Sequence, residues 1–189
     1  MAVHRIFRKA GKYIFQLGFV NFLEMIIINL LLLIYCFYRE QQIYEEAQQD
    51  DNLKNGYRLP FLRTREYVML TCAYNLGSVI SLSTLQTVTL ERPYVPTLIQ
   101  FFNFVFWVVN LKYMFLTNFN AVFVWVMWIG CQQGTDYTNF LFLANCKTNM
   151  DYDMNLNYFE RELVCNLLLI SNDIGGFFAS VIGYAYLQY

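Results

Sequence analysis

The chain is 189 residues long, 57% hydrophobic and 19% aromatic, with a formal net charge of −1. Charged residues make up only 14% of it, and most of them gather in four stretches, 1–12, 39–66, 91–92 and 136–162. Because an isolated charge in hydrocarbon is expensive, this clustering indicates an integral membrane protein rather than a soluble domain. The near-neutral balance argues against nucleic acid as a partner, since nucleic-acid-binding faces are strongly basic.

Motifs that carry chemistry are few. The five cysteines form no C-x-x-C pair and the single histidine, His4, stands in the N-terminal tail, so neither a metal site nor a cofactor is predicted. The sequence has no phosphate-binding glycine loop and no nucleophile elbow, and a non-enzymatic protein is expected. Cys131 and Cys146 flank one predicted loop and are a candidate disulfide; two free thiols are the alternative.

Residues 1–16 are basic and contain no acidic residue. The apolar segment that follows is too long for a signal peptide and lacks a small-residue cleavage site. We therefore expect a basic interfacial segment ahead of a first membrane span, with a mitochondrial targeting segment as the alternative.

The first span is predicted over residues 17–38 and contains two polar residues, Glu24 and Asn29. A carboxylate inside a membrane span is a candidate proton or ion site, although Glu24 could also lie at the interface. Residues 39–66 are predicted to form a polar loop.

Two later spans carry small residues at four-residue spacing, which places them on one face of a helix. The second span, residues 67–88, has Ala73, Gly77 and Ser81, and the last span, residues 163–187, has Gly175, Ala179 and Gly183. Such faces let helices approach closely in lipid, and we expect both to be packing faces. Asp173 of the last span is a second candidate intramembrane carboxylate. It could share a polar site with Glu24, or each could bond to neighbouring asparagines.

The third apolar run, residues 97–131, contains all three tryptophans and a single charge, Lys112. It exceeds the roughly 20 residues that one crossing needs. A polar cluster at 110–120 divides it. We favour one long tilted helix with this polar face turned inward; two segments broken near 110–120, giving five crossings or a re-entrant turn, are the alternative. Residues 132–162, which include Asp136, are predicted to be a second solvated loop.

Together these features predict an all-α, polytopic transmembrane four-helix bundle, with residues 17–189 as one domain. The layout resembles the MARVEL group of four-span membrane proteins, especially small fungal members associated with eisosomes. Local similarities are the segments 69–74 (MLTCAY) and 101–106 (FFNFVF), and Cys131 at the end of the third span. The resemblance implies a plasma-membrane protein that organises membrane domains or trafficking through packing with lipids, other membrane proteins or its own copies.

Two other functions remain open. The basic N-terminal segment and the long loops also fit an accessory subunit of a large complex in the mitochondrial inner membrane. A small transporter or channel would use Glu24, Asp173 and Lys112, although no internal repeat between the halves supports it.

Overall fold

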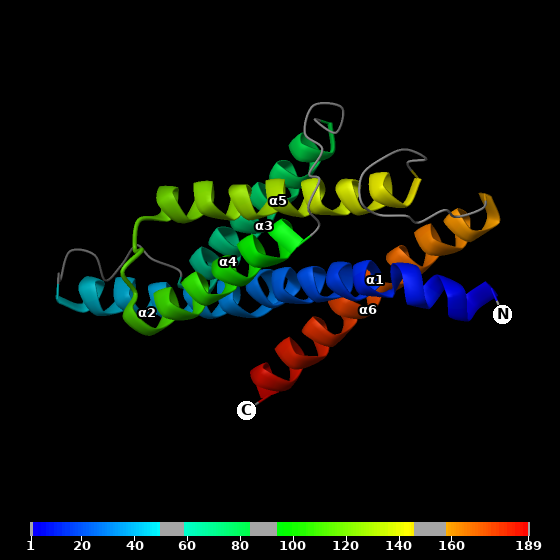
Figure 1. Cartoon of the computed structure of the whole chain (residues 1–189). Helices are drawn as coiled ribbons and strands as arrows, with labels where there is room; N and C mark the ends of the chain where they lie inside the picture. The colour runs from blue at the N-terminus through cyan, green and yellow to red at the C-terminus, as the bar shows by residue number, and fades with distance from the viewer. Residues whose placement is uncertain (1, 50–58, 84–93, 146–157, 189) are drawn as a thin grey trace.

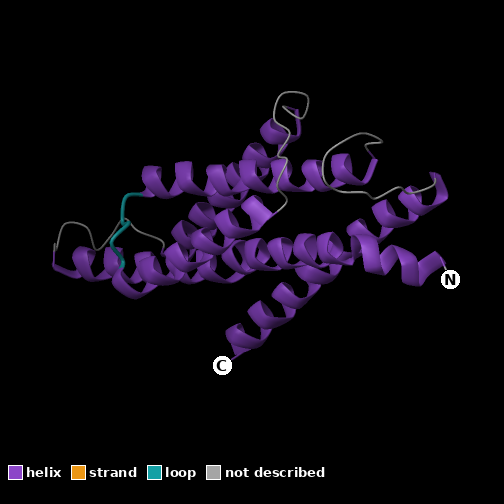
Figure 2. Ribbon diagram, viewed as in Figure 1, coloured by secondary structure: helices purple, strands orange, loops and turns teal. Residues whose placement is uncertain are grey.

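The computed structural model describes residues 2–49, 59–83, 94–145 and 158–188. All secondary structure in these ranges is helical, as Figure 2 shows, so the all-α prediction is confirmed. The elements are α1 (Ala2–Ile26), the π-helical turn η1 (Ile27–Leu31), α2 (Leu32–Gln49), α3 (Leu59–Ser83), α4 (Tyr94–Tyr113), α5 (Phe119–Asn145) and α6 (Tyr158–Gln188).

The first three elements form one continuous rod. Figure 1 shows this rod running through the length of the molecule, with α6 crossing it obliquely. At 1.5 Å per residue the rod is about 70 Å long, more than twice the bilayer core. Residues 2–16 of the predicted interfacial segment and the first part of the predicted loop 39–66 are therefore helical extensions of the first span.

The prediction of one long helix over 97–131 is wrong. α4 ends at Tyr113, α5 begins at Phe119, and Met114 between them has a positive φ of 47°. The Asn110 side chain accepts the backbone N–H of Leu116 at 2.9 Å, and the Asn118 side chain accepts that of Asn120 at 3.0 Å. Asparagine side chains that bond to nearby backbone groups compete with the helical ladder, which explains a break at this polar cluster.

The predicted boundaries also shift at the second large loop. α5 continues to Asn145, so the first half of the segment 132–162 is helical rather than looped. The buried residues of this half include Asp136, Asn139 and Phe140. Polar residues there face other helices, so their polarity does not indicate a solvated loop.

α1 and α6 touch through their backbones. The Ser171 hydroxyl donates to the carbonyl oxygen of Ile14 at 2.6 Å, and one turn further along Gly175 lies against the carbonyl of Gly18. Asn21 adds a hydrogen bond to the Asn172 carbonyl at 2.5 Å. Because the contact positions rise together in both helices, α1 and α6 run in the same direction.

α3 and α5 pack in the same manner. Gly130 lies against the backbone of Tyr74, and Gly134 lies against Ser81. Between these contacts the Ser78 hydroxyl donates to the Gln133 side-chain oxygen at 2.6 Å. The contact positions again rise together, so this pair is also parallel.

The parallel pairs are incompatible with the predicted four-span layout. In an up-and-down bundle of four spans the first and fourth helices are antiparallel, whereas here the first and last rods are parallel. The break at 114–118 reverses the direction of the chain once more, which makes the first and last rods parallel. The four-helix count is therefore replaced, in the described residues, by five helical rods.

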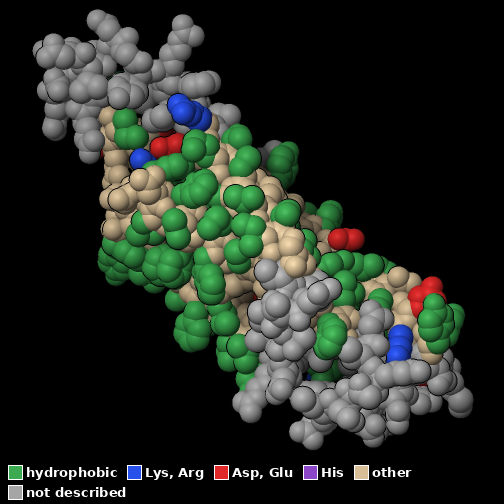
Figure 3. Space-filling view, turned by 90° about the horizontal axis from the view of Figure 1, so that it is seen from above, with side chains coloured by type: hydrophobic (Ala, Val, Ile, Leu, Met, Phe, Trp, Pro, Cys, Tyr) green, Lys and Arg blue, Asp and Glu red, His purple; other side chains and the backbone are tan. Residues whose placement is uncertain are grey.

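Three helical stretches are long and apolar enough to cross a membrane, namely Ala10–Glu45, Tyr94–Tyr113 and Tyr158–Tyr186. α3 and α5 do not meet this criterion, and they pack on each other. On the face shown in Figure 3, hydrophobic side chains cover the middle of the molecule and most coloured charged side chains lie towards its two ends. The core includes Trp107 of α4 and Tyr35 of α2. Their rings pack edge to face, with 5.9 Å between the ring centroids.

Candidate functional site

Two carboxyl groups on different helices are buried in the interior. Glu24 of α1 is 1% exposed and Asp136 of α5 is 4% exposed, and their charges interact electrostatically. One oxygen of each, Oε1 of Glu24 and Oδ2 of Asp136, has no hydrogen-bond partner among the described residues. Unsatisfied buried polar groups cost about 1–3 kcal/mol each, and more when charged. The burial of these two oxygens therefore costs the fold stability.

Tyr74 of α3 completes a three-helix cluster. Its ring is 95% buried, its hydroxyl has no hydrogen-bond partner in the part of the chain that the structure describes, and it interacts electrostatically with Glu24. Within the same described residues, no lysine or arginine forms an ion pair with Glu24. We refer to Glu24, Tyr74 and Asp136 as the carboxyl cluster.

A group of amide side chains lies between α4 and α5. Asn103 donates to the side-chain oxygen of Gln100 at 3.2 Å and also to that of Gln132, which joins the two helices. Gln100 is fully buried, and the Nε2 atoms of Gln100 and Gln132 have no acceptor among the described residues. These amides offer donors that are available to a bound molecule.

The intramembrane residues predicted from the sequence do not assemble as a set. Glu24 lies in the carboxyl cluster, whereas Asp173 and Lys112 are exposed and Asn29 is half-buried, with its amide 4.0 Å from the Met25 sulfur. Glu24 and Asp173 thus share no site. Asp136, the second buried carboxyl of the interior, was missed because its polar surroundings were interpreted as a loop. Gly130 and Gly134, four residues apart just before it, were a packing signal that extended the helix.

The six predicted helix-packing residues lie in different environments. Ala73 and Ala179 are buried, and Gly77, Ser81 and Gly175 lie at helix contacts. Gly183, by contrast, has open space where a side chain would begin.

The predicted disulfide cannot be placed as a pair. Cys131 is a half-buried free thiol in α5, and Cys146 lies outside the described residues. No cluster of three or more histidine, cysteine, aspartate or glutamate side chains suited to a metal ion occurs within the described ranges.

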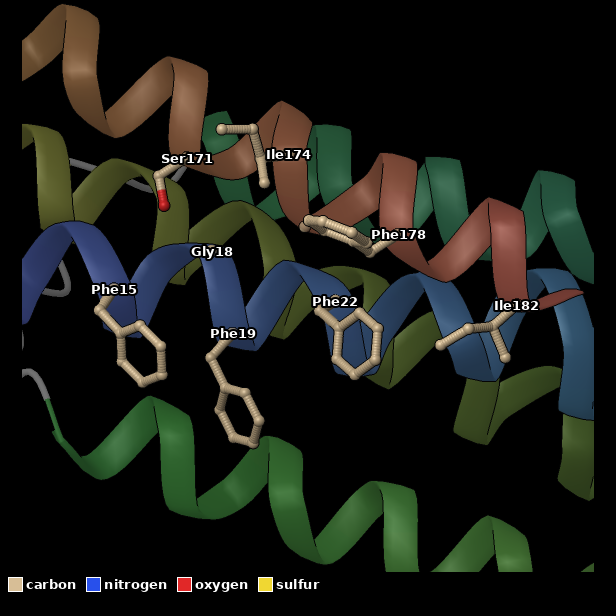
Figure 4. A pocket seen from close by; sticks show the side chains of 9 residues that line it. Phe15, Gly18, Phe19, Phe22, Ser171, Ile174, Phe178 and Ile182 are labelled. Carbon is tan, nitrogen blue, oxygen red and sulfur yellow. The ribbon is translucent and has the colours of Figure 1, made fainter.

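A hollow of about 420 Å³ lies where α6 passes α1. Figure 4 shows Phe15, Phe19 and Phe22 of α1 along one side, with Ile174 and Phe178 of α6 on the other. Its one hydroxyl, that of Ser171, already donates to the backbone of α1. The groove therefore suits an apolar group.

The comparisons with known proteins assign the chain to a family. The family model described as CLN3 protein matches residues 3–188, nearly the whole chain. The chain belongs to the CLN3 protein family. This membership overturns the resemblance to MARVEL proteins, in agreement with the break at 114–118 and the parallel first and last rods.

One curated CLN3-family relative is battenin from Dictyostelium discoideum. It is 30% identical over 115 residues, which cover 61% of this chain and 26% of battenin. The alignment thus spans about a quarter of the relative's length. No solved structure matches the chain.

Proposed function

We propose that this CLN3-family chain is a non-enzymatic membrane protein that moves small polar solutes or ions through its helical interior. The observation that supports this function is the carboxyl cluster, with the unsatisfied amides of Gln100 and Gln132 in the same interior. Ionisable residues inside membrane proteins are rare, face the bundle interior and mark solute or proton pathways. The names of the matched family and relative state no activity, so the support is physical.

A structural role in a membrane assembly is the second candidate. The outer face of α6 favours it, since large apolar side chains such as Phe177 and Tyr184 are 65% and 66% exposed. Such a face fits lipid, other membrane proteins or a second copy. A purely structural protein, however, gains nothing from unpaired carboxyl oxygens in its interior, because an apolar core of similar volume is at least as stable.

The membrane that we propose is lysosomal or vacuolar, on the basis of family membership. A fluorescently tagged full chain should colocalise with a lysosomal or vacuolar marker. Colocalisation with a plasma-membrane or mitochondrial marker would instead support one of the two compartments expected from the sequence.

The transport proposal predicts that water reaches the polar interior. This can be tested before the transported solute is known. Gln100→Cys and Gln132→Cys variants would be reconstituted in liposomes and treated with a membrane-impermeant thiol reagent on both sides. Peptide mass spectrometry would then measure labelling at each introduced cysteine. Val122→Cys is the matched control, because Val122 is fully buried in the apolar core of α5. We expect labelling at one or both amide positions and none at the control. Protection of all three positions would favour the structural role.

A further inference from the structure

The groove between α1 and α6 has a floor of backbone and walls of large apolar side chains. On its floor, Gly175 lies against the Gly18 carbonyl. The walls are built by Phe15, Phe19 and Phe22 of α1 and by Ile174, Phe178 and Ile182 of α6 (Figure 4). Both helices belong to stretches that are long and apolar enough to cross a membrane. The open side of the groove therefore faces hydrocarbon when the chain spans a bilayer.

The groove has the length and width of a single hydrocarbon chain. Its lining on α6 runs from Ser171 to Ile182, which is about 16 Å at 1.5 Å per residue. One leaflet of a bilayer core of about 30 Å is about 15 Å deep, so the groove is as long as one acyl chain. Over this length the volume of 420 Å³ gives a mean cross-section of about 26 Å². A helix with its side chains is about 10–12 Å across, or about 80–110 Å² in cross-section, and does not fit inside.

The α1 wall of the groove continues towards the N-terminus as a basic helix face. Positions 5, 8 and 12 are all basic and continue the spacing of three and four residues that relates 15, 19 and 22. Positions with this spacing lie on the same side of a helix. Lys12 is exposed one turn before Phe15, and its Nζ lies 4.8 Å from the centre of the Tyr13 ring. The positive charge thus lies at one end of the groove.

The charges of α6 at this end do not cancel those of α1. Because the two helices are parallel, the first turns of α6 lie beside the basic segment, and they carry Glu160, Arg161 and Glu162. Residues 2–16 contain four lysines and arginines and no acidic residue. The four positive charges of α1 and the net −1 of α6 leave an excess of +3. An anionic headgroup complements such an excess.

We infer that the groove between α1 and α6 binds one acyl chain of a phospholipid whose anionic headgroup lies at the basic end of α1. The chain runs from the end near Lys12 towards Ile182. The apolar walls select the hydrocarbon, and the basic face selects the charge of the headgroup, so the site discriminates an anionic phospholipid from a zwitterionic one. This inference goes beyond the proposed transport function and does not depend on it.

Native mass spectrometry of the full chain tests the groove. The chain would be released from mild detergent that contains equal amounts of phosphatidylserine and phosphatidylcholine, and the retained lipids would be counted. We expect the wild type to retain one phosphatidylserine per chain in preference to phosphatidylcholine. Ile174→Trp fills the groove and should abolish retention. Ile170→Trp is the matched control, because Ile170 is 53% exposed and Ile174 50% exposed on the same helix, but Ile170 does not line the groove.

Substitutions of basic residues test the headgroup separately. The double variant Arg8→Gln/Lys12→Gln removes two charges from the basic face and leaves the groove intact. It should lower the preference for phosphatidylserine over phosphatidylcholine by about fivefold per charge removed. Lys112→Gln is the control, since Lys112 is an exposed basic residue in the last turn of α4, and it should leave the preference unchanged.

The melting temperature in detergent provides a second readout, which also shows whether each variant folds. Phosphatidylserine should raise the melting temperature of the wild type and of Ile170→Trp but not that of Ile174→Trp, because a ligand stabilises only a folded state that binds it. Equal retention by the two tryptophan variants, or equal retention of the two lipids by the wild type, would overturn the inference. A lipid-free dimer would also overturn it and would assign the groove to a second copy of the chain.

Discussion

The side-chain oxygen of Asn110 accepts the backbone N–H of Leu116 at 2.9 Å, across the break between α4 and α5. Asn110 is fully buried. Its side chain therefore takes the place of water as the hydrogen-bond partner of the Leu116 N–H, which has no partner within a helix. Replacement by leucine, of similar size, removes the acceptor. We expect Asn110→Leu to lower the free energy of unfolding by about 1–3 kcal/mol, measured by titration with a denaturing detergent.

A neighbouring asparagine provides the control for this substitution. Asn120 is exposed at the start of α5, and its bond to Asn118 uses its backbone N–H rather than its side chain. Asn120→Ala should change stability by less than about 0.5 kcal/mol. Equal effects of the two substitutions would mean that the break does not depend on the Asn110 side chain.

Gly175 and Gly183 are a matched pair on α6 with opposite surroundings. A methyl group at Gly175 would overlap the Gly18 carbonyl oxygen and come within 3.1 Å of the Phe22 nitrogen, whereas at Gly183 nothing lies within 4 Å. Gly175→Ala should destabilise by about 1–3 kcal/mol through overpacking, and Gly183→Ala should be neutral or slightly stabilising because alanine favours helix. Thermal unfolding in mild detergent measures both. A reversed order would contradict the close approach of α1 and α6.

Gly77 and Gly130 test the contact between α3 and α5. A methyl group at Gly77 would overlap the Met127 carbonyl, and one at Gly130 would lie within 3.0 Å of the Tyr74 Cα. Either substitution forces the same two helices apart. The double variant Gly77→Ala/Gly130→Ala should therefore destabilise by less than the sum of the single variants, since coupled neighbours are not additive. Strict additivity in unfolding measurements would show that the helices adjust locally.

Glu66 predicts a dependence of stability on pH. Its carboxylate lies 3.4 Å from the Arg39 guanidinium, just before the apolar part of α3. Burial raises the pKa of Glu66 above its ordinary value of 4.5, and the Arg39 charge opposes this less strongly. Because the pKa of Glu66 is higher in the folded state than in the unfolded state, the protonated carboxyl makes its full contribution to stability below the ordinary pKa. This contribution is lost as the pH rises through the pKa of the folded state.

The comparison of wild type with Glu66→Gln isolates this group, because other titrations cancel. We expect the melting temperature of the wild type to fall relative to that of the variant as the pH rises from about 4 to about 7. Arg39 retains its contacts with Tyr35 and the ring of Phe119 in the variant. A relative rise of the wild type over this range would show that the ion pair outweighs the desolvation of Glu66.

The amino-acid sequence alone is sufficient to predict a helical membrane protein. Long uncharged runs and clustered charges predict membrane helices, because transfer of apolar and charged side chains into lipid depends on composition alone. The same local reasoning located Glu24 and the glycines at 77 and 175 before any neighbour was known. The polar cluster at 110–120 was also visible, but whether it forms an inward face or a break depends on the partners of Asn110 and Asn118.

Which polar residues are buried, and which groups they contact, depends on the packing of the helices. Asp136 follows two glutamines and a glycine, a local pattern that also fits a solvated loop; its burial comes from the packing of α5 against α1 and α3. Asp173 lies among apolar residues yet faces outwards. Pairing between helices distant in sequence is set by backbone contacts such as Gly18 with Gly175, and local composition does not encode which carboxyl those contacts bring to Glu24.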